Sequence, residues 1–296
     1  MHPAISVSHL TYRHQPGTDL SLHDVALSLP RGSRTIIVGA NGGMLGHFAR
    51  PFPQPRFSAG KSTLLQILAG KRLVSTQGAH IFIQGHDVFR DSPLGVSFLG
   101  TEWAMNPVVR GDIIVSAFLD SVGGYRHKER RDRLLDILDV DLDWHMHQIS
   151  DGERRRVQLC FGLMVPWDVL LLDEVTVDLD VLVRDDLLNF LKADSEQRGA
   201  TILYATHIFD GLNNFPTHIM HMRLGSVIQP PAAWPISSAS SLTSQFDSST
   251  PLYTVALQWL KEDRDNRQEL ERNGRKKRGA RRDEILPTDS ETFYKK

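Results

Sequence analysis

A phosphate-binding pattern split into two halves is the feature that most constrains this chain. Its first half, Gly39–Gly42, follows Thr35–Val38, a run of mainly β-branched residues that predicts a buried strand. Its second half, Ala59–Thr63, opens a helix predicted over 61–69, with Gly70 as C-cap. A strand, a glycine-rich turn and a helix N-terminus form an anion site, because free backbone N–H groups and the helix dipole point at the phosphate.

The two halves are separated by an insert, residues 43–58. The phosphate-loop pattern places four residues between its first glycine and its Gly-Lys pair, whereas here Gly39 and Gly60 are much further apart. Without the insert the loop reads G-A-N-G-A-G-K-S-T, which matches the pattern fully. The insert carries three prolines and three phenylalanines, and proline cannot supply the N–H donors that a phosphate nest needs.

Two explanations fit the insert. A tolerated surface loop is one, since long insertions cost little closure entropy, but this position faces the phosphate. The hypothesis that we favour is a translated intron. Residues 43–45 can be encoded with GTATGTT, which is similar to a common fungal splice donor, and residues 57–59 can be encoded with a pyrimidine-rich CAG acceptor. Splicing within codons 43 and 59 then joins an alanine codon and restores the loop.

The length and composition of the chain suit either one sizeable domain with appendages or two domains. The chain has 296 residues, of which 41% are hydrophobic, enough for a substantial core. A net charge of −1 gives no overall signal for polyanion binding. The single cysteine, Cys160, excludes an internal disulfide and predicts a reduced compartment. Neither a signal peptide nor an apolar run of about 20 residues is recognisable, so no membrane span is expected.

Strands that alternate apolar and polar residues are predicted before the split loop and after its helix. They cover 5–13 and 22–29 before the loop and 80–84 after it. Tyr12 lies in the first of these strands. An ordinary strand aromatic is the simplest interpretation, but a phosphate loop one hairpin later favours a platform for an adenine base.

Two later strands end in side chains that suit phosphate chemistry. The apolar run 169–172 predicts a buried parallel strand and is followed by Asp173 and Glu174. A carboxylate at the end of such a strand can hold Mg²⁺, and a second one can polarise an attacking water. The strand predicted over 201–206 ends at His207. A lone histidine there is usually structural, but this one lies where a γ-phosphate sensor would be.

The middle of the chain is predicted to be largely helical. One helix covers 125–140, and a second runs to about Met164 behind Ser150 and Asp151, which are N-cap residue types. The basic run 154–156 is interpreted as a solvated face of this second helix.

Four further histidines are interpreted as ordinary residues. His145 and His147 suggest a metal site only if a third ligand lies nearby, and without one we interpret them as solvated. His218 and His221 belong to a predicted hairpin over 217–229 and are interpreted as strand residues.

These motifs, in this order, resemble the nucleotide-binding domain of ABC-type ATPases over residues 4–229. The resemblance implies an α/β P-loop ATPase with an antiparallel β subdomain, a mixed core sheet and a helical subdomain at about 100–165. It implies ATP and Mg²⁺ as ligands and an ATP-dependent, head-to-tail homodimer.

The resemblance also assigns roles to residues. Lys61 would contact the β- and γ-phosphates, Ser62 and Asp173 would ligate Mg²⁺, Glu174 would be the catalytic base, and His207 the switch histidine. Residues 150–153 resemble the signature motif, which contacts ATP on the opposite subunit, and 178–180 resemble the D-loop. The implied nucleotide-binding residues are Tyr12, Gly39, Asn41, Gly42, Gly60, Lys61, Ser62, Thr63, Ser150, Gly152 and Asp180.

The sequence departs from the family pattern at three places. The phosphate loop is interrupted. The usual Q-loop glutamine is missing, and Thr101 and Glu102 stand in that segment. The signature carries Asp151 and Glu153 where glycine and glutamine are common. Acidic groups suit a helix N-terminus, although Asp151 would also oppose a nearby γ-phosphate.

Residues 98–110 together with the signature segment narrow the resemblance. They look like the small soluble ABC ATPases without membrane domains that occur in fungi and plants, and the fungal member is associated with the Ccr–Not complex. A regulatory role in gene expression and a cytoplasmic, also nuclear, localisation are therefore expected. Two alternatives stay open: a detached ATPase subunit of a membrane transporter, and a non-catalytic adaptor.

The C-terminal region differs in composition from the domain. Residues 230–250 are rich in Pro and Ser and are predicted to be a linker. Residues 251–296 contain a predicted helix, which we expect to dock on the domain rather than on a partner, and a basic tail. Residues 275–282 are the only stretch expected to contact nucleic acid, and a solvated run or a nuclear-import signal are equal alternatives.

Mass spectrometry of a tryptic digest from the native source tests the intron hypothesis. We expect the peptide T-I-I-V-G-A-N-G-A-G-K, which joins residues 35–42 directly to 59–61. Detection of T-I-I-V-G-A-N-G-G-M-L-G-H-F-A-R, residues 35–50, without the joined peptide would contradict the hypothesis.

Overall fold

The computed structural model separates into two compact units, residues 1–263 and 264–296. We describe each unit by itself. In the second unit, only residues 264–273 are described, and they are the last part of a helix. The structure describes residues 2–14, 20–41, 58–74, 76, 78–100, 110–237, 242 and 245–273.

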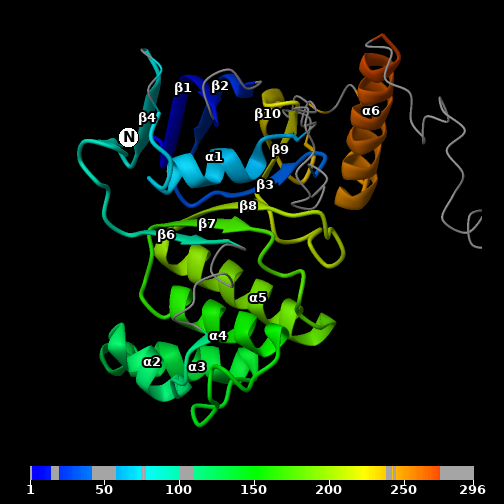
Figure 1. The fold of residues 1–296 in the computed structure, drawn as a ribbon. Helices are drawn as coiled ribbons and strands as arrows, with labels where there is room; N and C mark the ends of the chain where they lie inside the picture. The colour runs from blue at the N-terminus through cyan, green and yellow to red at the C-terminus, as the bar shows by residue number, and fades with distance from the viewer. Residues whose placement is uncertain are drawn as a thin grey trace, which may run out of the picture. The chain divides into compact units, whose positions relative to one another are not determined.

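An antiparallel sheet of four strands forms one part of the first unit (Figure 1). Its order is β2-β1-β4-β5, and the central strand β1 pairs with β2 and β4, so that Ile5 faces both Leu29 and Ile83. The alternation of its strands buries one face of the sheet. The strands are β1 (Ile5–Arg13), β2 (Leu20–Leu29), β4 (His80–Ile83) and β5 (His86–Asp87).

A mixed sheet of six strands forms the core, in the order β10-β9-β3-β8-β7-β6. All pairs are parallel except the hairpin of β9 and β10. Every residue of β3, β7 and β8 is buried, as expected for strands covered on both faces. The strands are β3 (Arg34–Val38), β6 (Val96–Leu99), β7 (Val169–Asp173), β8 (Thr201–Ala205), β9 (His218–Arg223) and β10 (Ser226–Ala233).

The two faces of the mixed sheet belong to two separate apolar clusters. Ile36 and Leu170 pack with the helices on one face, whereas their neighbours Ile37 and Leu171 pack with α1 and the antiparallel sheet on the other. Figure 1 shows α1 on one side of the strands and α4 and α5 on the other. The helices are α1 (Lys61–Leu68), α2 (Val115–Ser121), η3 (Gly124–His127), α3 (Lys128–Leu138), α4 (Asp151–Leu163) and α5 (Val181–Arg198). This arrangement confirms the predicted fold class.

The C-terminal helix α6 (Leu252–Asn273) begins on the core. Leu252, Val255, Ala256 and Trp259 belong to the same cluster as α4 and α5, so the predicted docking on the domain is confirmed. The described part of 230–250 differs from the predicted linker. It contains the end of β10 and the buried side chains of Trp234 and Phe246, which belong to the same apolar cluster as the start of α6.

A buried carboxylate joins α3 to α5. Both guanidinium nitrogens of Arg130 donate to Asp194, at 2.6 and 2.8 Å, and Arg198 donates to the same carboxylate at 2.8 Å. Burial by itself raises the pKa of Asp194, but the two arginines outweigh it and hold the pKa at about 2, against an ordinary 3.8.

The pH dependence of unfolding tests this interaction. Because the folded-state pKa of Asp194 lies below the unfolded value, the carboxylate stabilises the fold above about pH 4, and this contribution disappears as the pH falls from about 4 to about 2. Urea unfolding of the wild type and Asp194→Asn should show that the variant loses part of this acid dependence. Asp185→Asn, at an exposed position of α5, is the control, and equal acid dependence in all three proteins would contradict the assignment.

Candidate functional site

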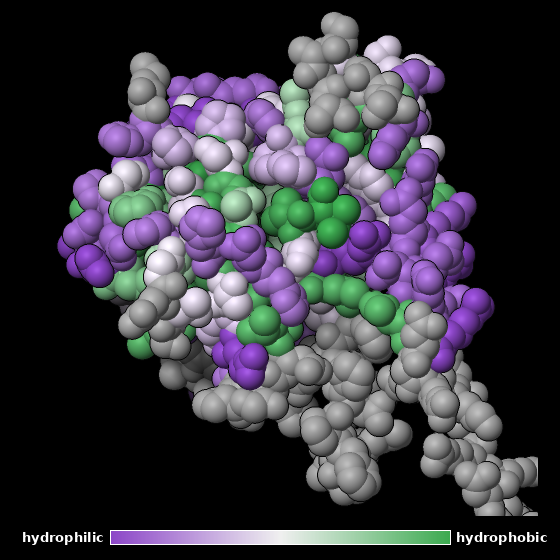
Figure 2. All heavy atoms as spheres, turned by 90° about the horizontal axis from the view of Figure 1, so that it is seen from above, coloured by the Kyte–Doolittle hydropathy of each residue, from purple (hydrophilic) through white to green (hydrophobic). Residues whose placement is uncertain are grey.

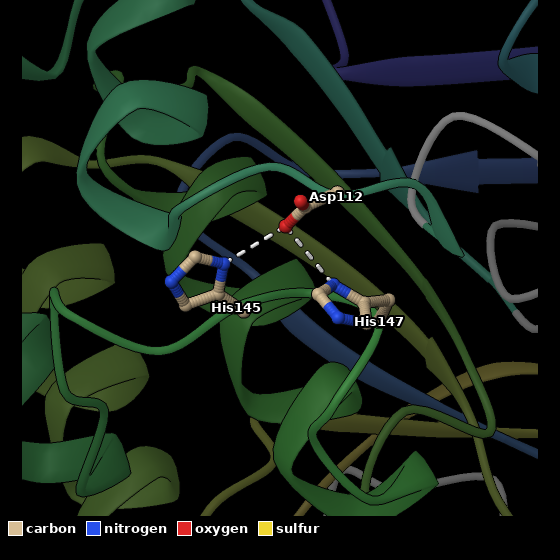
Figure 3. A group of neighbouring side chains, drawn as sticks. All are labelled: Asp112, His145 and His147. Carbon is tan, nitrogen blue, oxygen red and sulfur yellow. Dashed lines mark hydrogen bonds and ion pairs between the residues drawn. The ribbon is translucent and has the colours of Figure 1, made fainter.

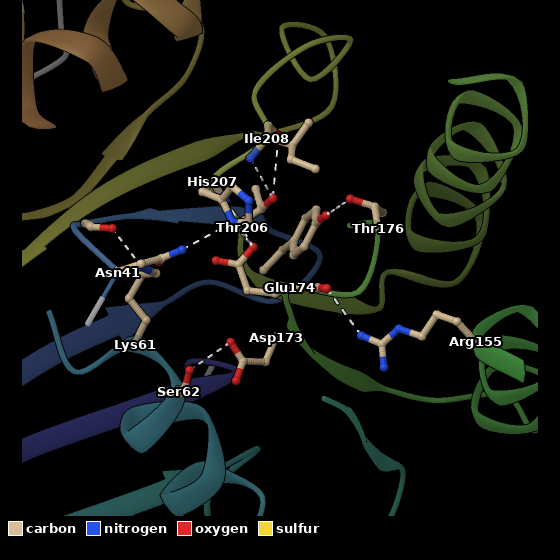
Figure 4. A network of polar contacts seen from close by, with 12 residues as sticks. Asn41, Lys61, Ser62, Arg155, Asp173, Glu174, Thr176, Thr206, His207 and Ile208 are labelled. Carbon is tan, nitrogen blue, oxygen red and sulfur yellow. Dashed lines mark hydrogen bonds and ion pairs between the residues drawn. The ribbon is translucent and has the colours of Figure 1, made fainter. Parts of the chain in front are cut away.

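The predicted catalytic residues converge at one edge of the mixed sheet. β3, β8 and β7 are neighbouring parallel strands, so their carboxyl ends meet at this edge. Asp173 is the last residue of β7, Glu174 follows it, and His207 lies just beyond β8. Lys61 and Ser62 open α1, which follows β3. Figure 4 shows these side chains turned toward a common centre.

The two halves of the phosphate loop lie together although the insert separates them in sequence. The amide of Ala59 donates to the carbonyl of Ala40 at 3.2 Å, and Lys61 Nζ donates to Gly39 O at 2.6 Å. The chain therefore leaves for the insert and returns from it at nearly the same place. Gly60 has φ +88°, and a Cβ there would meet Leu22 and Ser21, so only glycine suits this turn.

Lys61 is a buried cation that faces oxygen atoms. Its side chain is 5% exposed, and Nζ also donates to Asn41 Oδ1 at 2.7 Å. Burial lowers the pKa of Lys61, and the nearby carboxylates of Glu174 and Asp173 oppose that effect. The group is positioned to exchange these two oxygen acceptors for those of a bound anion.

Ser62 and Asp173 offer two adjacent oxygen atoms. The Ser62 hydroxyl donates to Asp173 Oδ1 at 3.1 Å. Burial raises the pKa of Asp173, whereas the Ser62 hydrogen bond and the Lys61 charge counteract the shift. A hydroxyl and a carboxylate at this spacing are the hard ligands that Mg²⁺ takes beside substrate phosphates, so these residues fit the ion.

Glu174 combines a strained backbone with a carboxylate oxygen that has no hydrogen-bond partner in the described chain. Its φ of +53° is rare for a residue with a side chain, and such strain gathers at functional sites. Oε2 lies 2.7 Å from Nδ1 of His207 and accepts the His207 amide at 3.2 Å. Oε1 is buried and has no hydrogen-bond partner. This orphaned acceptor fits a carboxylate that takes a proton from a water molecule.

Arg155 supports the backbone beside Glu174, a role that sequence reasoning missed. Its guanidinium donates to the carbonyls of Gly100 at 2.8 Å, Glu174 at 3.3 Å and Val175 at 3.4 Å. The prediction of a solvated face is therefore wrong for Arg154 and Arg155, which are 7% and 6% exposed. Backbone carbonyls accept hydrogen bonds from both guanidinium groups, and Arg154 also pairs with Asp151, although its Nε is buried without a partner among the described residues. No local sequence pattern reveals such partners.

The signature and D-loop residues form a separate group. The Ser150 hydroxyl accepts the Glu153 amide at 3.2 Å and caps α4, while Asp180 caps α5 by accepting the Val183 amide at 3.0 Å. Gly152 packs so that a Cβ would lie 3.6 Å from the carbonyl of Asp178. Among the described residues, no direct hydrogen bond joins Ser150, Gly152 or Asp180 to the residues at the edge of the mixed sheet, namely Lys61, Ser62, Asp173, Glu174 and His207.

His14, which sequence reasoning missed, connects Tyr12 to the start of α1. Its ring contacts the His14 ring edge-on at 5.3 Å, and His14 Nε2 lies 3.5 Å from the Thr63 hydroxyl. The adenine-platform role stays a prediction. Gly42, Thr101, Glu102 and residues 43–57 of the insert lie outside the described residues.

The helix α6 reaches the phosphate loop through Asp263. This side chain is 4% exposed; its Oδ2 accepts the Ala40 amide at 3.3 Å, and its Oδ1 lies 2.9 Å from His221 Nε2. The His221 ring stacks on Trp259 with 5.0 Å between centroids. The interpretation of His221 as an ordinary strand residue is thus incomplete, because its partner lies 42 positions away.

Comparisons with known proteins agree with this geometry. Solved structures of an ATP-binding subunit of an ABC transporter (TM-score 0.68, 18% identity, 86% of this chain and 99% of that chain) and of a nucleotide-free ATP-binding cassette (TM-score 0.59, 16% identity, 78% and 91%) share the fold. The family described as ABC transporter matches residues 58–177, beginning at the end of the insert. The fold is therefore that of the ATP-binding cassettes.

Curated relatives extend the likeness over most of the chain. CCR4-associated factor 16 of Saccharomyces cerevisiae is 42% identical over 243 residues, which cover 76% of this chain and 77% of the relative. ABC transporter I family member 20 of Arabidopsis thaliana is 39% identical over 276 residues, covering 90% and 75%. This chain belongs to the ABC ATPase family. None of the described helices is both long and apolar enough to cross a membrane.

Removal of the Asp263 carboxylate tests the contact between α6 and the loop. Asp263→Ala leaves the half-buried amide of Ala40 and the buried ring of His221 without this acceptor, and should lower the free energy of unfolding by about 1–3 kcal/mol. Asp265→Ala, at an exposed position two residues later, should change it by less than about 0.5 kcal/mol. Equal losses in denaturant unfolding of both variants would contradict the contact.

Proposed function

We propose that this protein binds ATP with Mg²⁺ and hydrolyses it. The observation that carries the proposal is the convergence of Lys61, Ser62, Asp173, Glu174 and His207 at the carboxyl edge of three parallel strands. A buried cation, a pair of hard oxygen ligands and an unsatisfied carboxylate oxygen are the parts that phosphoryl transfer to water requires.

Each of these residues has a distinct task. The Lys61 ammonium binds phosphate oxygens, and the Ser62 hydroxyl and the Asp173 carboxylate hold Mg²⁺, which neutralises phosphate charge. Glu174 orients the attacking water and accepts its proton at Oε1, the oxygen that has no protein partner. His207 holds the other carboxylate oxygen through Nδ1 and so fixes the direction of Oε1. Arg155 keeps the strained backbone of Glu174 in place.

We also propose that two chains associate head to tail. In the described chain, no direct hydrogen bond joins the signature and D-loop residues to Lys61 or to the carboxylates beside it. Ser150 caps α4 and Asp180 caps α5. The ion pair between Arg156 of α4 and Asp180, at 3.0 Å, indicates that the two helices start beside one another. A second copy would bring this group to the nucleotide of the first. ATP would then be shared by two chains and its binding would favour the dimer.

A regulatory role linked to the Ccr–Not complex, rather than transport, is the cellular part of the proposal. Its support is the name of the yeast relative, CCR4-associated factor 16, at 42% identity. The plant relatives are named as ABC transporter family members, so an ATPase subunit of a transporter is the second candidate. Detergent-sensitive co-fractionation with membranes would favour that candidate. Partner binding that is unchanged in Lys61→Ala and Glu174→Gln would instead favour a non-catalytic adaptor.

Nucleotide binding by two forms of the chain tests the ATPase proposal. The form that lacks residues 43–58 should bind ATP with Mg²⁺ and hydrolyse it. The full chain should bind at least about tenfold more weakly, because loss of one charge-assisted hydrogen bond to phosphate costs about 1.5–3 kcal/mol. Absence of ATP binding by both folded forms would overturn the proposal.

Variants of the form without the insert separate binding from chemistry. Lys61→Ala should weaken ATP binding about 10- to 100-fold, whereas Lys71→Ala, at an exposed position just past α1, should leave it unchanged. Glu174→Gln should retain binding and lower the rate of hydrolysis by about 10²- to 10⁴-fold. Hydrolysis by Glu174→Gln at the wild-type rate would rule out Glu174 as the base.

A further inference from the structure

A second group of metal-ligating side chains lies away from the ATP site, in the helical region. Asp112, His145 and His147 each offer one ligand atom, and these atoms all lie within 4.8 Å of one another. The sequence-based interpretation of the two histidines as solvated depended on the lack of a third ligand. The fold supplies that ligand from a segment 33 positions upstream.

Backbone hydrogen bonds fix the two segments that carry these side chains. Ile114 and His145 form an antiparallel bridge. The Met146 amide donates to the carbonyl of Ile113 at 2.9 Å, and the Val115 amide donates to the carbonyl of Trp144 at 2.8 Å. His145 therefore lies in this bridge, and Asp112 and His147 lie next to residues whose backbone is hydrogen-bonded across it. Backbone held in this way reduces the entropy cost of gathering the side chains around an ion.

A turn over 145–148 sets the positions of the two histidines, since the Gln148 amide donates to the carbonyl of His145 at 2.9 Å. Met146 is fully buried, whereas His145 is half-buried and His147 is exposed. Figure 3 shows both rings turned toward the carboxylate of Asp112. Oδ1 of Asp112 lies 2.9 Å from Nδ1 of His145 and 3.1 Å from Nδ1 of His147.

These distances are close to what a tetrahedral metal ion requires. Zinc–nitrogen and zinc–oxygen bonds of about 2.0–2.2 Å separate neighbouring ligand atoms by about 3.3–3.5 Å. The two distances to Asp112 need to open by only a few tenths of an ångström to admit the ion, and the two imidazole ligand atoms lie within 4.8 Å of each other.

The surroundings also supply an outer partner for one ligand. The Gln148 amide lies 3.1 Å from Nε2 of His147. If the Gln148 amide is rotated, its oxygen accepts a hydrogen bond from Nε2–H of His147. A partner at Nε2 orients a histidine that binds a metal through Nδ1. Two imidazoles and one carboxylate with an open position suit Zn²⁺ rather than Mg²⁺, which prefers oxygen ligands.

We propose that Asp112, His145 and His147 form a Zn²⁺ site on the helical region. Three protein ligands leave the remaining position to water or to a group from a partner. The site lies just before Ser150, and the carbonyl of Met146 already accepts a hydrogen bond from Arg154 of α4 at 3.0 Å. A bound ion would tie the two segments together at the entry to this helix.

Zinc titration of the untagged full-length protein tests the site. Metal-stripped protein competes with a chromophoric chelator for Zn²⁺ in the presence of excess Mg²⁺, which occupies sites made of oxygen ligands. The wild type should bind one Zn²⁺ tightly, and His147→Gln and Asp112→Asn should each weaken that binding at least about tenfold. Circular dichroism verifies that both variants are folded.

A histidine–carboxylate pair without a third ligand, elsewhere in the chain, provides a matched control. His9 Nδ1 lies 3.1 Å from Asp24 Oδ1 on an exposed surface. His9→Gln removes a histidine with the same kind of carboxylate neighbour and should leave Zn²⁺ binding unchanged. Cobalt should give visible absorption bands with the wild type and His9→Gln but not with His147→Gln. Equal Zn²⁺ binding by the wild type, His147→Gln and Asp112→Asn, or no tight binding by the wild type, would overturn the proposal.

Discussion

The parallel pairing of β3, β8 and β7 is the constraint on which the rest of the structure depends. The register aligns Ile37 and Asp173 with the same residue of β8, Ala205, so the three strands end level with one another. Functional side chains from three distant places in the chain therefore lie together at one edge of the sheet. The buried Lys61 ammonium donates to Gly39 O and Asn41 Oδ1, and the Asp173 and Glu174 carboxylates partly offset the effect of burial on its pKa.

Two elements outside the phosphate loop hold this edge in place. Arg155 of α4 binds the carbonyl groups around Glu174, and Asp263 of α6 binds the amide of Ala40 in the first half of the loop. Both are charged and nearly excluded from solvent. Such groups are stable in a core only when hydrogen bonds satisfy them, and here the backbone of the site itself supplies many of those bonds. The position of the site and the burial of these charges thus depend on each other.

The helical region carries its own chemistry beside the signature residues. Asp112 and the two histidines belong to segments that pair directly before α4, whose N-cap is Ser150. Arg154 connects this pairing to the helix by donating to the carbonyls of Met146 and Ile149. The start of α4 is therefore defined from one side by its own capping box and from the other by the paired segments.

Local patterns in the sequence were enough to predict the elements and much of the candidate site. The apolar run at 169–172 predicted a buried parallel strand, because strands covered on both faces need apolar side chains throughout, and residues 201–206 were predicted as a second buried strand. Ser150 was predicted as an N-cap from its residue type alone. The grouping of Lys61, Ser62, Asp173 and Glu174 was implied by the resemblance of the motif order to the ABC-type ATPases.

Only the tertiary structure decided which distant side chains became partners. Arg155 and Gly100 are 55 positions apart, His221 and Asp263 are 42, and Asp112 and His145 are 33. A hydrogen bond across such separations leaves no periodicity in the sequence, because it depends on how whole elements pack and not on the residues between them. The sequence by itself therefore determined the strands, the caps and the motif order, whereas packing of α4, α6 and the paired segments decided which charges are buried and what they bind.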